Sequence, residues 1–215
     1  FLCPSTPRRE NPHSYTWSGD LPVPITYRSG GNDYGPSNGV AGSELRAFAP
    51  PQSGNPAGEG ILSNNILNAR FEMARDGLSS TALMWEVAGR PDVWQAGVRL
   101  DGAATGGGGW ADVLNAERWF RGSPHDGSSV GGPCAINCTN QFETGTYSLH
   151  PGGVHVLLCD GSARLVNESL NVGTFVELVT YAGGTPLGEF SSVTPRPAAA
   201  GVDATPVRPP LARGS

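Results

Sequence analysis

The sequence contains no lysine, and all 14 of its basic side chains are arginines spread along the chain. The formal net charge at pH 7 is −5, so the chain lacks the positive surface with which proteins bind nucleic-acid phosphates. A phosphate-binding loop of the Gly-x-x-x-x-Gly-Lys-Ser/Thr type is also excluded, because that loop needs its lysine. The composition therefore excludes nucleic acid as a partner and the usual nucleotide-hydrolysing loop.

Long apolar runs are equally absent. No stretch approaches the roughly 18–20 apolar residues that a membrane-spanning helix needs, and the longest runs, such as residues 154–159, have the length of a strand. The first residues, Phe1-Leu2-Cys3-Pro4, lack the charged start and the long apolar centre of a signal peptide. The sequence starts as if within a domain, and we expect a further segment upstream.

Glycine and proline are abundant instead, with 31 and 19 residues respectively. Both residues interrupt helices and strands, so the regular elements should be short and the loops long. Five Trp, seven Phe and five Tyr supply large side chains for a core, and the low net charge opposes disorder. The composition predicts a modest folded core that carries long, ordered loops.

The four cysteines favour disulfides and an oxidising compartment outside the cytoplasm. Cys134 and Cys138 are close enough in the chain to form a local bridge. That pairing leaves Cys3 and Cys159 for a long-range bridge, whereas the alternative is four reduced thiols with Cys159 as a small apolar strand residue. A zinc site of four cysteines is disfavoured, because the usual two-residue spacings are absent.

The clearest local structure is a predicted hairpin. Two strand-like runs, residues 154–159 and 162–166, flank Asp160-Gly161. An Asp-Gly pair between two such runs favours a type I′ turn, which has positive φ at both central residues. We therefore expect an antiparallel hairpin with its tip at Asp160 and Gly161.

Other elements are expected to be short. Residues 167–181 predict a helix with Thr174 as its N-cap. Residues 81–87 predict a buried strand, and shorter strands are expected around residues 16–17 and 25–28.

Glycine-rich and proline-rich segments organise the rest of the chain. Residues 106–109 are four consecutive glycines and predict a flexible loop, which Trp110, Trp119 and Phe120 should hold against the body. From about Ser191 the chain becomes rich in Pro, Ala and Arg, as in an extended tail. We therefore divide the chain into a head domain, residues 1–190, and a Pro/Ala-rich tail, residues 191–215.

Several short motifs occur in a fixed order. Nine residues separate His150 from the Asp160-Gly161 pair, and this segment resembles the H-X9-DG motif of the DUF1559 family of prepilin-processing-associated proteins. Residues 75–86 resemble the family's TDGTSNTLLVGE segment, with departures at Leu78, Ser80 and Trp85. The resemblance covers roughly residues 1–182, and its other matches are Cys3-Pro4-Ser5, Asp33-Tyr34 with Asn38-Gly39-Val40, and residues 132–140.

The resemblance implies a fold and a function. Members of that family begin with a type IV pilin-like signal and a long apolar helix, so it implies an α+β, mainly antiparallel β, pilin-like head whose N-terminal pilin helix is absent from this chain. It implies assembly with identical or related subunits and with secretion or pilus machinery. Contact with a membrane would be made only through that upstream helix. It brings no established catalytic activity, so we expect no enzyme.

Two residues of the matched motif invite a chemical interpretation. His150 and Asp160 could be paired as a metal ligand or a general base with its carboxylate, but the hairpin would separate their side chains by roughly 20 Å, at about 3.3 Å per residue. We therefore expect structural roles for both. Asp160 and Gly161 should form the turn, and His150 should bind the main chain of the bend that contains Gly152 and Gly153.

Asp76-Gly77 is expected to be a tight turn. Asp76 and Asp33 are the only calcium candidates that we single out, and both are weak, since calcium needs six to eight oxygen ligands. We accordingly expect no metal and no other cofactor.

Glu86 follows a strongly apolar strand. A carboxylate in that position should be buried and paired, and Arg90 and Arg75 are the expected partners, because an unpaired buried charge is costly.

The sequence leaves two functions open. The first is a structural subunit of a pilus-like fibre or of a type II secretion-like pseudopilus, located outside the cytoplasm at the cell surface, in the periplasm or in the medium. The second is an extracellular carbohydrate- or surface-binding module, in which Trp94, Trp110 and Trp119 stack on sugar rings from loops. Exposed, coplanar rings would favour the second function.

Overall fold

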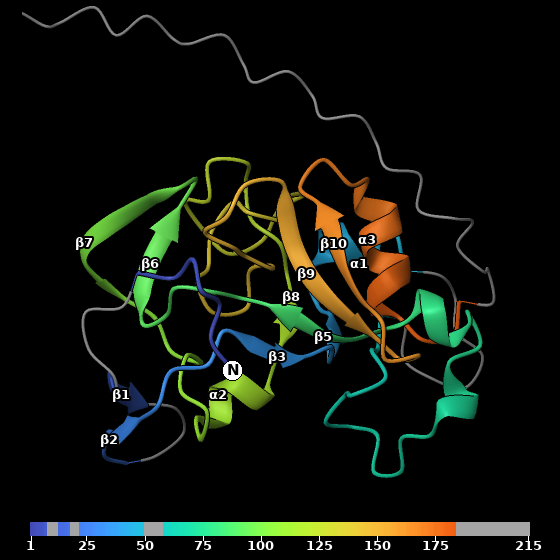
Figure 1. Ribbon diagram of the computed structural model, residues 1–215, viewed down its shortest axis with the longest axis horizontal. Helices are drawn as coiled ribbons and strands as arrows, with labels where there is room; N and C mark the ends of the chain where they lie inside the picture. Colours follow the sequence, from blue (N-terminus) through green and yellow to red (C-terminus); the bar gives the residue numbers. More distant parts are fainter. Residues whose placement is uncertain (8–12, 18–21, 50–57, 184–215) are drawn as a thin grey trace, which may run out of the picture.

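A four-stranded antiparallel sheet forms the centre of the protein in the computed structural model, which describes residues 1–7, 13–17, 22–49 and 58–183 (Figure 1). The strands follow the order β10-β9-β5-β3. Their bounds are β3 (Tyr34–Pro36), β5 (Ala82–Glu86), β9 (Gly153–Leu158) and β10 (Ala163–Asn167).

Three two-stranded pairs surround this sheet. The pairs β1–β2 and β6–β7 are antiparallel, and β4 runs parallel to β8. The predicted α+β fold, mainly antiparallel β, is confirmed, as are the strands expected around residues 16–17 and 25–28. The bounds are β1 (His13–Trp17), β2 (Ile25–Ser29), β4 (Gly39–Val40), β6 (Asp92–Gln95), β7 (Val98–Ala104) and β8 (Trp119–Phe120).

The predicted hairpin is present as β9 and β10, but its turn differs from the expected one. Gly161 has a φ of 84° and its N–H donates to the Leu158 carbonyl over 3.0 Å, whereas Asp160 does not have a positive φ. A single left-handed glycine after the turn is typical of a longer hairpin loop rather than of type I′. The Asp160 carboxylate closes the loop by accepting from the Ser162 N–H at 2.9 Å and from the Ser162 hydroxyl at 2.7 Å.

One face of the sheet is covered by helix α3 (Val172–Val179). Side chains alternate along a strand, so Val154, Val156 and Leu158 of β9 point to this face and are buried. The N-cap of α3 is Asn171, whose side chain accepts from the Gly173 N–H at 2.8 Å, and not Thr174 as predicted.

The main core lies between α3 and the sheet. The Trp85 ring of β5 is fully buried, with its centroid 5.0 Å from Phe175 of α3 and 6.2 Å from Phe120 of β8. Leu45 of the short helix α1 belongs to the same cluster, and in Figure 1 α1 stands next to α3 at the β10 end of the sheet. The remaining short elements are α1 (Ser43–Arg46), α2 (Val113–Ala116) and the 3₁₀ turns Phe71–Met73 and Leu78–Ser80.

The four glycines at residues 106–109 are packed against the protein and do not form the flexible loop that was predicted. The buried side chains of Arg90 and Arg118 both donate to the Gly107 carbonyl, at 3.5 and 3.1 Å. A Cβ atom at Gly108 would lie 2.5 Å from the Cβ of Arg90. The glycines are needed there because the main chain passes directly over an arginine.

Among the described residues, no helix has the length and apolar character needed to cross a membrane. The predicted tail, residues 191–215, lies outside the described residues, as does the end of the predicted head after residue 183.

Candidate functional site

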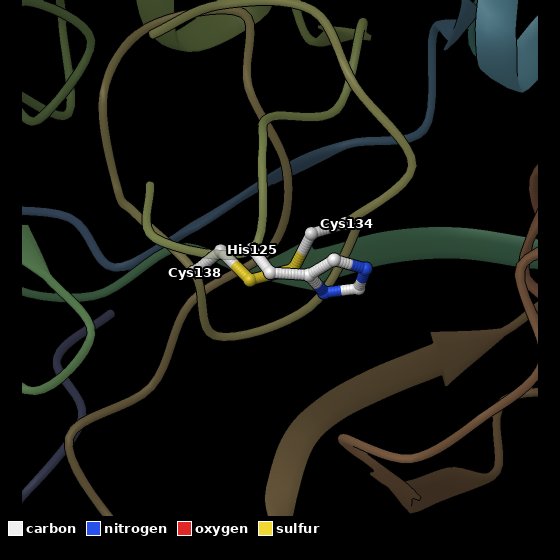
Figure 2. A group of neighbouring side chains, drawn as sticks. All are labelled: His125, Cys134 and Cys138. Carbon is white, nitrogen blue, oxygen red and sulfur yellow. A yellow bond between two sulfur atoms is a disulfide. The ribbon is translucent and has the colours of Figure 1, made fainter. Parts of the chain in front are cut away.

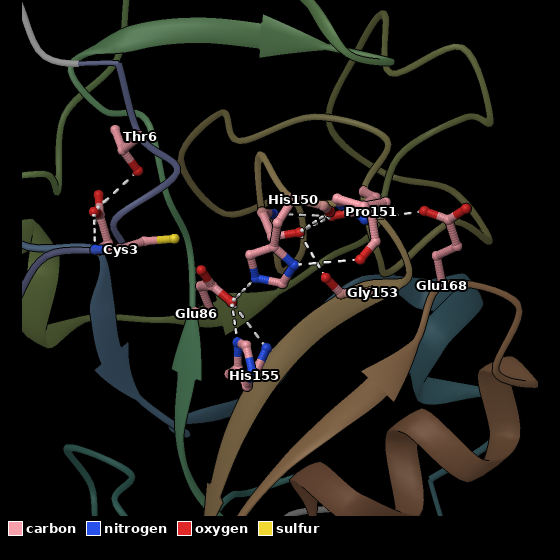
Figure 3. Close-up of polar contacts among 11 residues, drawn as sticks. Cys3, Thr6, Glu86, His150, Pro151, Gly153, His155 and Glu168 are labelled. Atoms are coloured by element: carbon pink, nitrogen blue, oxygen red, sulfur yellow. Dashed lines mark hydrogen bonds and ion pairs between the residues drawn. The ribbon is translucent and has the colours of Figure 1, made fainter. Parts of the chain in front are cut away.

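Three segments that are far apart in the sequence meet beside the last residue of β5. The register pairs Trp85 with Val156, which places Glu86 opposite His155 on the face away from α3. The segment 147–152 runs back over this position before it enters β9, and residues 1–6 lie on its other side (Figure 3). The sheet register therefore brings Glu86 to the centre of a polar group.

Two histidines bind the Glu86 carboxylate. Its Oε2 atom lies 3.1 Å from His150 Nε2 and 3.2 Å from His155 Nδ1, and it also accepts the main-chain N–H of His155 at 2.9 Å. The ring centroids of the histidines are 4.9 Å apart. The Glu86 side chain is fully buried, whereas those of His150 and His155 are 17% and 48% exposed.

Asp33 positions Cys3 beside this group. The Asp33 carboxylate is fully buried and accepts the Cys3 N–H at 2.7 Å, the Thr6 hydroxyl at 3.1 Å and the Gly89 N–H at 3.3 Å. As a result, the Cys3 sulfur, a Glu86 carboxylate oxygen and a His150 ring nitrogen lie within 4.8 Å of one another. Burial, together with the nearby Glu86 carboxylate, raises the pKa of the Cys3 thiol.

The expected ion pair of Glu86 with Arg90 or Arg75 is wrong. The Arg90 guanidinium instead donates to the carbonyls of Asn140 at 2.7 Å and Gln141 at 3.0 Å. The strand directs Glu86 toward the histidines, and its second oxygen, Oε1, is buried and accepts no N–H or O–H group of the part of the chain that the structure describes.

His150 also lines a cavity of about 740 Å³. The cavity lies between the 133–138 loop, the 147–150 segment and the start of α3. Its polar side chains include Glu168, which accepts from the Asn137 side chain at 3.0 Å. The expected contact of His150 with the following bend is also present, as a 3.5 Å contact between His150 Nδ1 and the Pro151 carbonyl. His150 therefore lies between an open cavity and the buried Glu86.

The bend after His150 needs both of its glycines. Gly152 and Gly153 have φ values of 97° and 139°, and a Cβ atom at Gly153 would collide with the Val166 carbonyl of β10. These glycines keep the 147–152 segment close to the sheet.

The local disulfide between Cys134 and Cys138 is present, and the expected bridge between Cys3 and Cys159 is not. Cys3 is buried beside Glu86, whereas Cys159 belongs to a second apolar cluster with Ile61, so the chain holds the two thiols in different surroundings. His125 lies next to the disulfide (Figure 2). The paired sulfurs offer no thiolate there, so this second group does not form a metal site in the oxidised protein.

The two calcium candidates serve as hydrogen-bond acceptors in separate places. Asp33 holds the N-terminal segment, and Asp76 accepts the Gly183 N–H at 2.9 Å. Within the described ranges, neither aspartate belongs to a group of three side chains that could hold a metal ion.

The loop tryptophans do not share one surface element. Trp94 lies on β6 and Trp119 on β8, and both are half-buried. Trp110 precedes α2 and is 72% exposed. The Trp119 indole N–H donates to the Asn64 side chain at 3.3 Å.

A serine within a Gly-x-Ser-x-Gly pattern is also structural. Ser37, between Gly35 and Gly39, is fully buried, accepts the Trp85 indole N–H at 3.3 Å and donates to the Val179 carbonyl at 3.4 Å. A nucleophilic serine needs an exposed hydroxyl beside a base, so this pattern does not form a hydrolase elbow.

Sequence reasoning identified Glu86, His150 and Cys3 separately and missed both their contact and His155. Two signals point to the cluster in retrospect. A histidine interrupts the apolar run of β9 at position 155, and Cys3, Glu86 and His150 each stand at one end of a matched motif. The group of Cys3, Glu86 and His150 lies beside the cavity. Its thiol, carboxylate and imidazole are groups that can bind a cation.

Comparisons with known proteins agree with the motifs. A family model described as "Protein of unknown function (DUF1559)" matches residues 1–173, which include Cys3, Glu86, His150 and His155. No curated protein and no solved structure matches the chain. Since the match spans most of the 215 residues, the chain belongs to the DUF1559 family.

Proposed function

We propose that this chain is the non-enzymatic head of an extracytoplasmic assembly subunit, part of a pilus-like fibre or of a type II secretion-like pseudopilus. Its partners would be identical or related pilin-like subunits and the secretion or pilus machinery. Attachment to a membrane would be made through a helix upstream of this chain. Family membership and the open face of the central sheet support this proposal.

The open face of the sheet is the observation that carries the proposal. Met84 pairs with Leu157, and His155 pairs with Leu165, so these side chains share the face opposite to α3. Leu165 is 53% exposed, and Met84 and Leu157 are only half-buried by the described residues. Apolar side chains that remain exposed on one face of a sheet can mark a surface for another protein segment.

The disulfide supports a location outside the cytoplasm. Cytoplasmic thiols are kept reduced, whereas disulfides persist in the periplasm and at the cell surface. The Cys134–Cys138 bridge closes the loop that lines the cavity, so reduction would loosen a part of the surface.

Carbohydrate or surface binding remains the alternative function. The exposed Trp110 ring favours it, because a bare indole can stack on a sugar. Trp94 and Trp119 add less support, since both are half-buried and lie on different strands.

The proposal is tested on the full-length protein from its source, by negative-stain electron microscopy. Leu165→Asp should reduce fibre formation strongly, because it places a charge on the open face. Val98→Asp is the matched control, since Val98 is 64% exposed on β7, outside the central sheet. Circular dichroism should show that both variants remain folded.

Two outcomes decide between the functions. Fibres that form in the wild type and in Val98→Asp but not in Leu165→Asp would support assembly through the sheet. Single particles in all three samples would refute the assembly role, and binding of glycans that is lost in Trp110→Ala would then establish the alternative.

A further inference from the structure

We propose that Cys3, Glu86 and His150 form a binding site for a divalent transition-metal ion, and that zinc is the ion that fits the site best. The three ligand atoms come from the N-terminal segment, the end of β5 and the segment before β9, and all lie within 4.8 Å of one another (Figure 3). The site does not depend on the assembly proposal, because it is complete within one chain.

The types of ligand atom in this site favour zinc over calcium and magnesium. A thiolate, an imidazole and a carboxylate together are typical of zinc, whereas calcium and magnesium prefer sites made of oxygen atoms alone. The cluster supplies one sulfur, one nitrogen and one carboxylate, so the hard cations are disfavoured.

The spacing of the atoms suits a small cation. Zinc binds at about 2.0–2.3 Å from nitrogen, oxygen and sulfur, which in a tetrahedron places neighbouring ligand atoms roughly 3.3–3.8 Å apart. Glu86 Oε2 and His150 Nε2 are already 3.1 Å apart. The Cys3 sulfur lies within 4.8 Å of both atoms, so small movements of the three side chains would surround the ion.

The buried carboxylate gives an independent reason for a cation. Glu86 is fully buried, and within the described ranges no N–H or O–H group donates to its Oε1 atom, although a buried charged group normally has all of its acceptors filled. No arginine contact to Glu86 occurs in the described part of the chain. A metal ion bound to the Glu86 carboxylate would supply a positive charge there.

The neighbouring groups orient the three ligands as outer partners do in known metal sites. Asp33 holds the main chain of Cys3 through the Cys3 N–H, and the Pro151 carbonyl lies 3.5 Å from the Nδ1 atom of His150, which leaves Nε2 for the metal. His155 contacts Glu86 Oε2 at 3.2 Å from the more exposed side, so we assign it as a positioning residue.

The cavity gives the ion a way in. His150 lines the 740 Å³ cavity on one side and contacts the buried Glu86 on the other. Three protein ligands leave one position of a tetrahedral ion for water or for a ligand group from the cavity.

The test uses the isolated chain with its disulfide intact, stripped of metal by a chelator and titrated with zinc chloride in a calorimeter. One zinc ion per chain should bind. Cys3→Ser, Glu86→Gln and His150→Ala should each weaken binding by at least about 100-fold, since even outer partners of metal ligands contribute 10–100-fold. His155→Ala should weaken it by only about 10-fold.

Two matched controls keep the test specific. Cys159→Ser removes the other buried free thiol, and His125→Ala removes the histidine beside the disulfide, so neither should change zinc affinity. Cobalt chloride gives a second readout, because thiolate-to-cobalt charge-transfer absorption should appear in the wild type and disappear in Cys3→Ser.

A measurement on the wild type covers the case in which a variant fails to fold. Zinc should slow the alkylation of Cys3 relative to that of Cys159, as followed by mass spectrometry of the two peptides. Equal alkylation of Cys3 with and without zinc, or wild-type affinity in a folded Cys3→Ser variant, would overturn the proposal.

Discussion

Glu86 organises its surroundings because it is a fully buried carboxylate at the end of a strand. One of its oxygens accepts three contacts, from His150, from the ring of His155 and from the main-chain N–H of His155. Removing one partner of a buried charge is strongly destabilising, because the remaining charge is left without compensation. At the scale of single residues, the segment before β9 is therefore held to the sheet by the contact of His150 with Glu86 as well as by packing.

The two free thiols should react slowly, but measurably, in the native, metal-free protein. Burial raises the pKa of Cys159 to about 11 and also raises the pKa of Cys3, so at pH 8 only about one Cys159 in a thousand is a thiolate. With metal removed, DTNB should react slowly with the folded chain. In denaturant two thiols should react, and after reduction all four, because Cys134 and Cys138 form the one disulfide.

The Cys159→Ser variant assigns the signal, since it leaves Cys3 as the free thiol of the unreduced chain. One reactive thiol in denatured Cys159→Ser is the expected count. Fewer than two reactive thiols in the denatured, unreduced wild type would contradict the structure and would support a disulfide between Cys3 and Cys159.

Helix α3 shows how one element depends on its first residue. The helix has eight residues, too few to be stable alone, and its apolar face gains stability only by packing on the sheet. The Asn171 side chain satisfies the Gly173 N–H, which would otherwise lack a partner at the helix start.

Asn171→Ala should lower the free energy of unfolding by about 1 kcal/mol, the usual cost of losing an N-cap. Thr174→Ala is the matched control and should change it by less than about 0.5 kcal/mol. Urea unfolding followed by circular dichroism measures both differences. A larger loss in Thr174→Ala than in Asn171→Ala would show that the helix begins where the sequence pattern predicted.

The elements that the sequence predicted are those with local signals. The β9–β10 hairpin follows from Asp160-Gly161 between two apolar runs, and β5 from the run around Trp85. The candidate site was missed because its contacts join residues 64 and 69 positions apart. Periodicity and turn residues carry no information on which strand becomes the neighbour of Glu86.

The glycines at 106–109 were misinterpreted for a related reason. A run of glycine looks flexible in a sequence, but here it makes room for the buried side chains of Arg90 and Arg118. Burial lowers the pKa of Arg118 to about 10, and the nearby Asp112 opposes that shift. The partners of these arginines are main-chain carbonyls, which no side-chain pattern reveals.

At the scale of the molecule, the sheet separates two kinds of surface. Its α3 side holds the main core with Trp85 and Phe175, and its other side carries the Glu86 group and the half-exposed Leu157. If the proposed assembly role holds, a substitution at an exposed position of the open face, away from Glu86, should affect assembly without unfolding the head.

Deleting the tail, residues 191–215, tests whether the head folds without it and whether the tail serves assembly. The family match ends at residue 173 and the residues named in the two described cores end at Ala182, so we expect deletion of residues 191–215 to leave both cores folded. The midpoint of thermal unfolding should change by less than about 2 °C, which corresponds to roughly 0.5 kcal/mol for a chain of this size. Fibre formation by the full-length protein, counted in negative stain, should decrease.

A variant in which a Gly/Ser segment of equal length replaces the tail shows whether assembly depends on the tail's Pro and Ala residues or only on its length. If the tail contacts a neighbouring subunit through its Pro and Ala residues, the Gly/Ser variant should assemble as poorly as the deletion, because a flexible chain loses more entropy on docking than a proline-rich one. Unchanged assembly after deletion would refute a role for the tail. A lower unfolding midpoint would instead show that the head extends beyond the described residues, and the boundary at residue 190 would then be wrong.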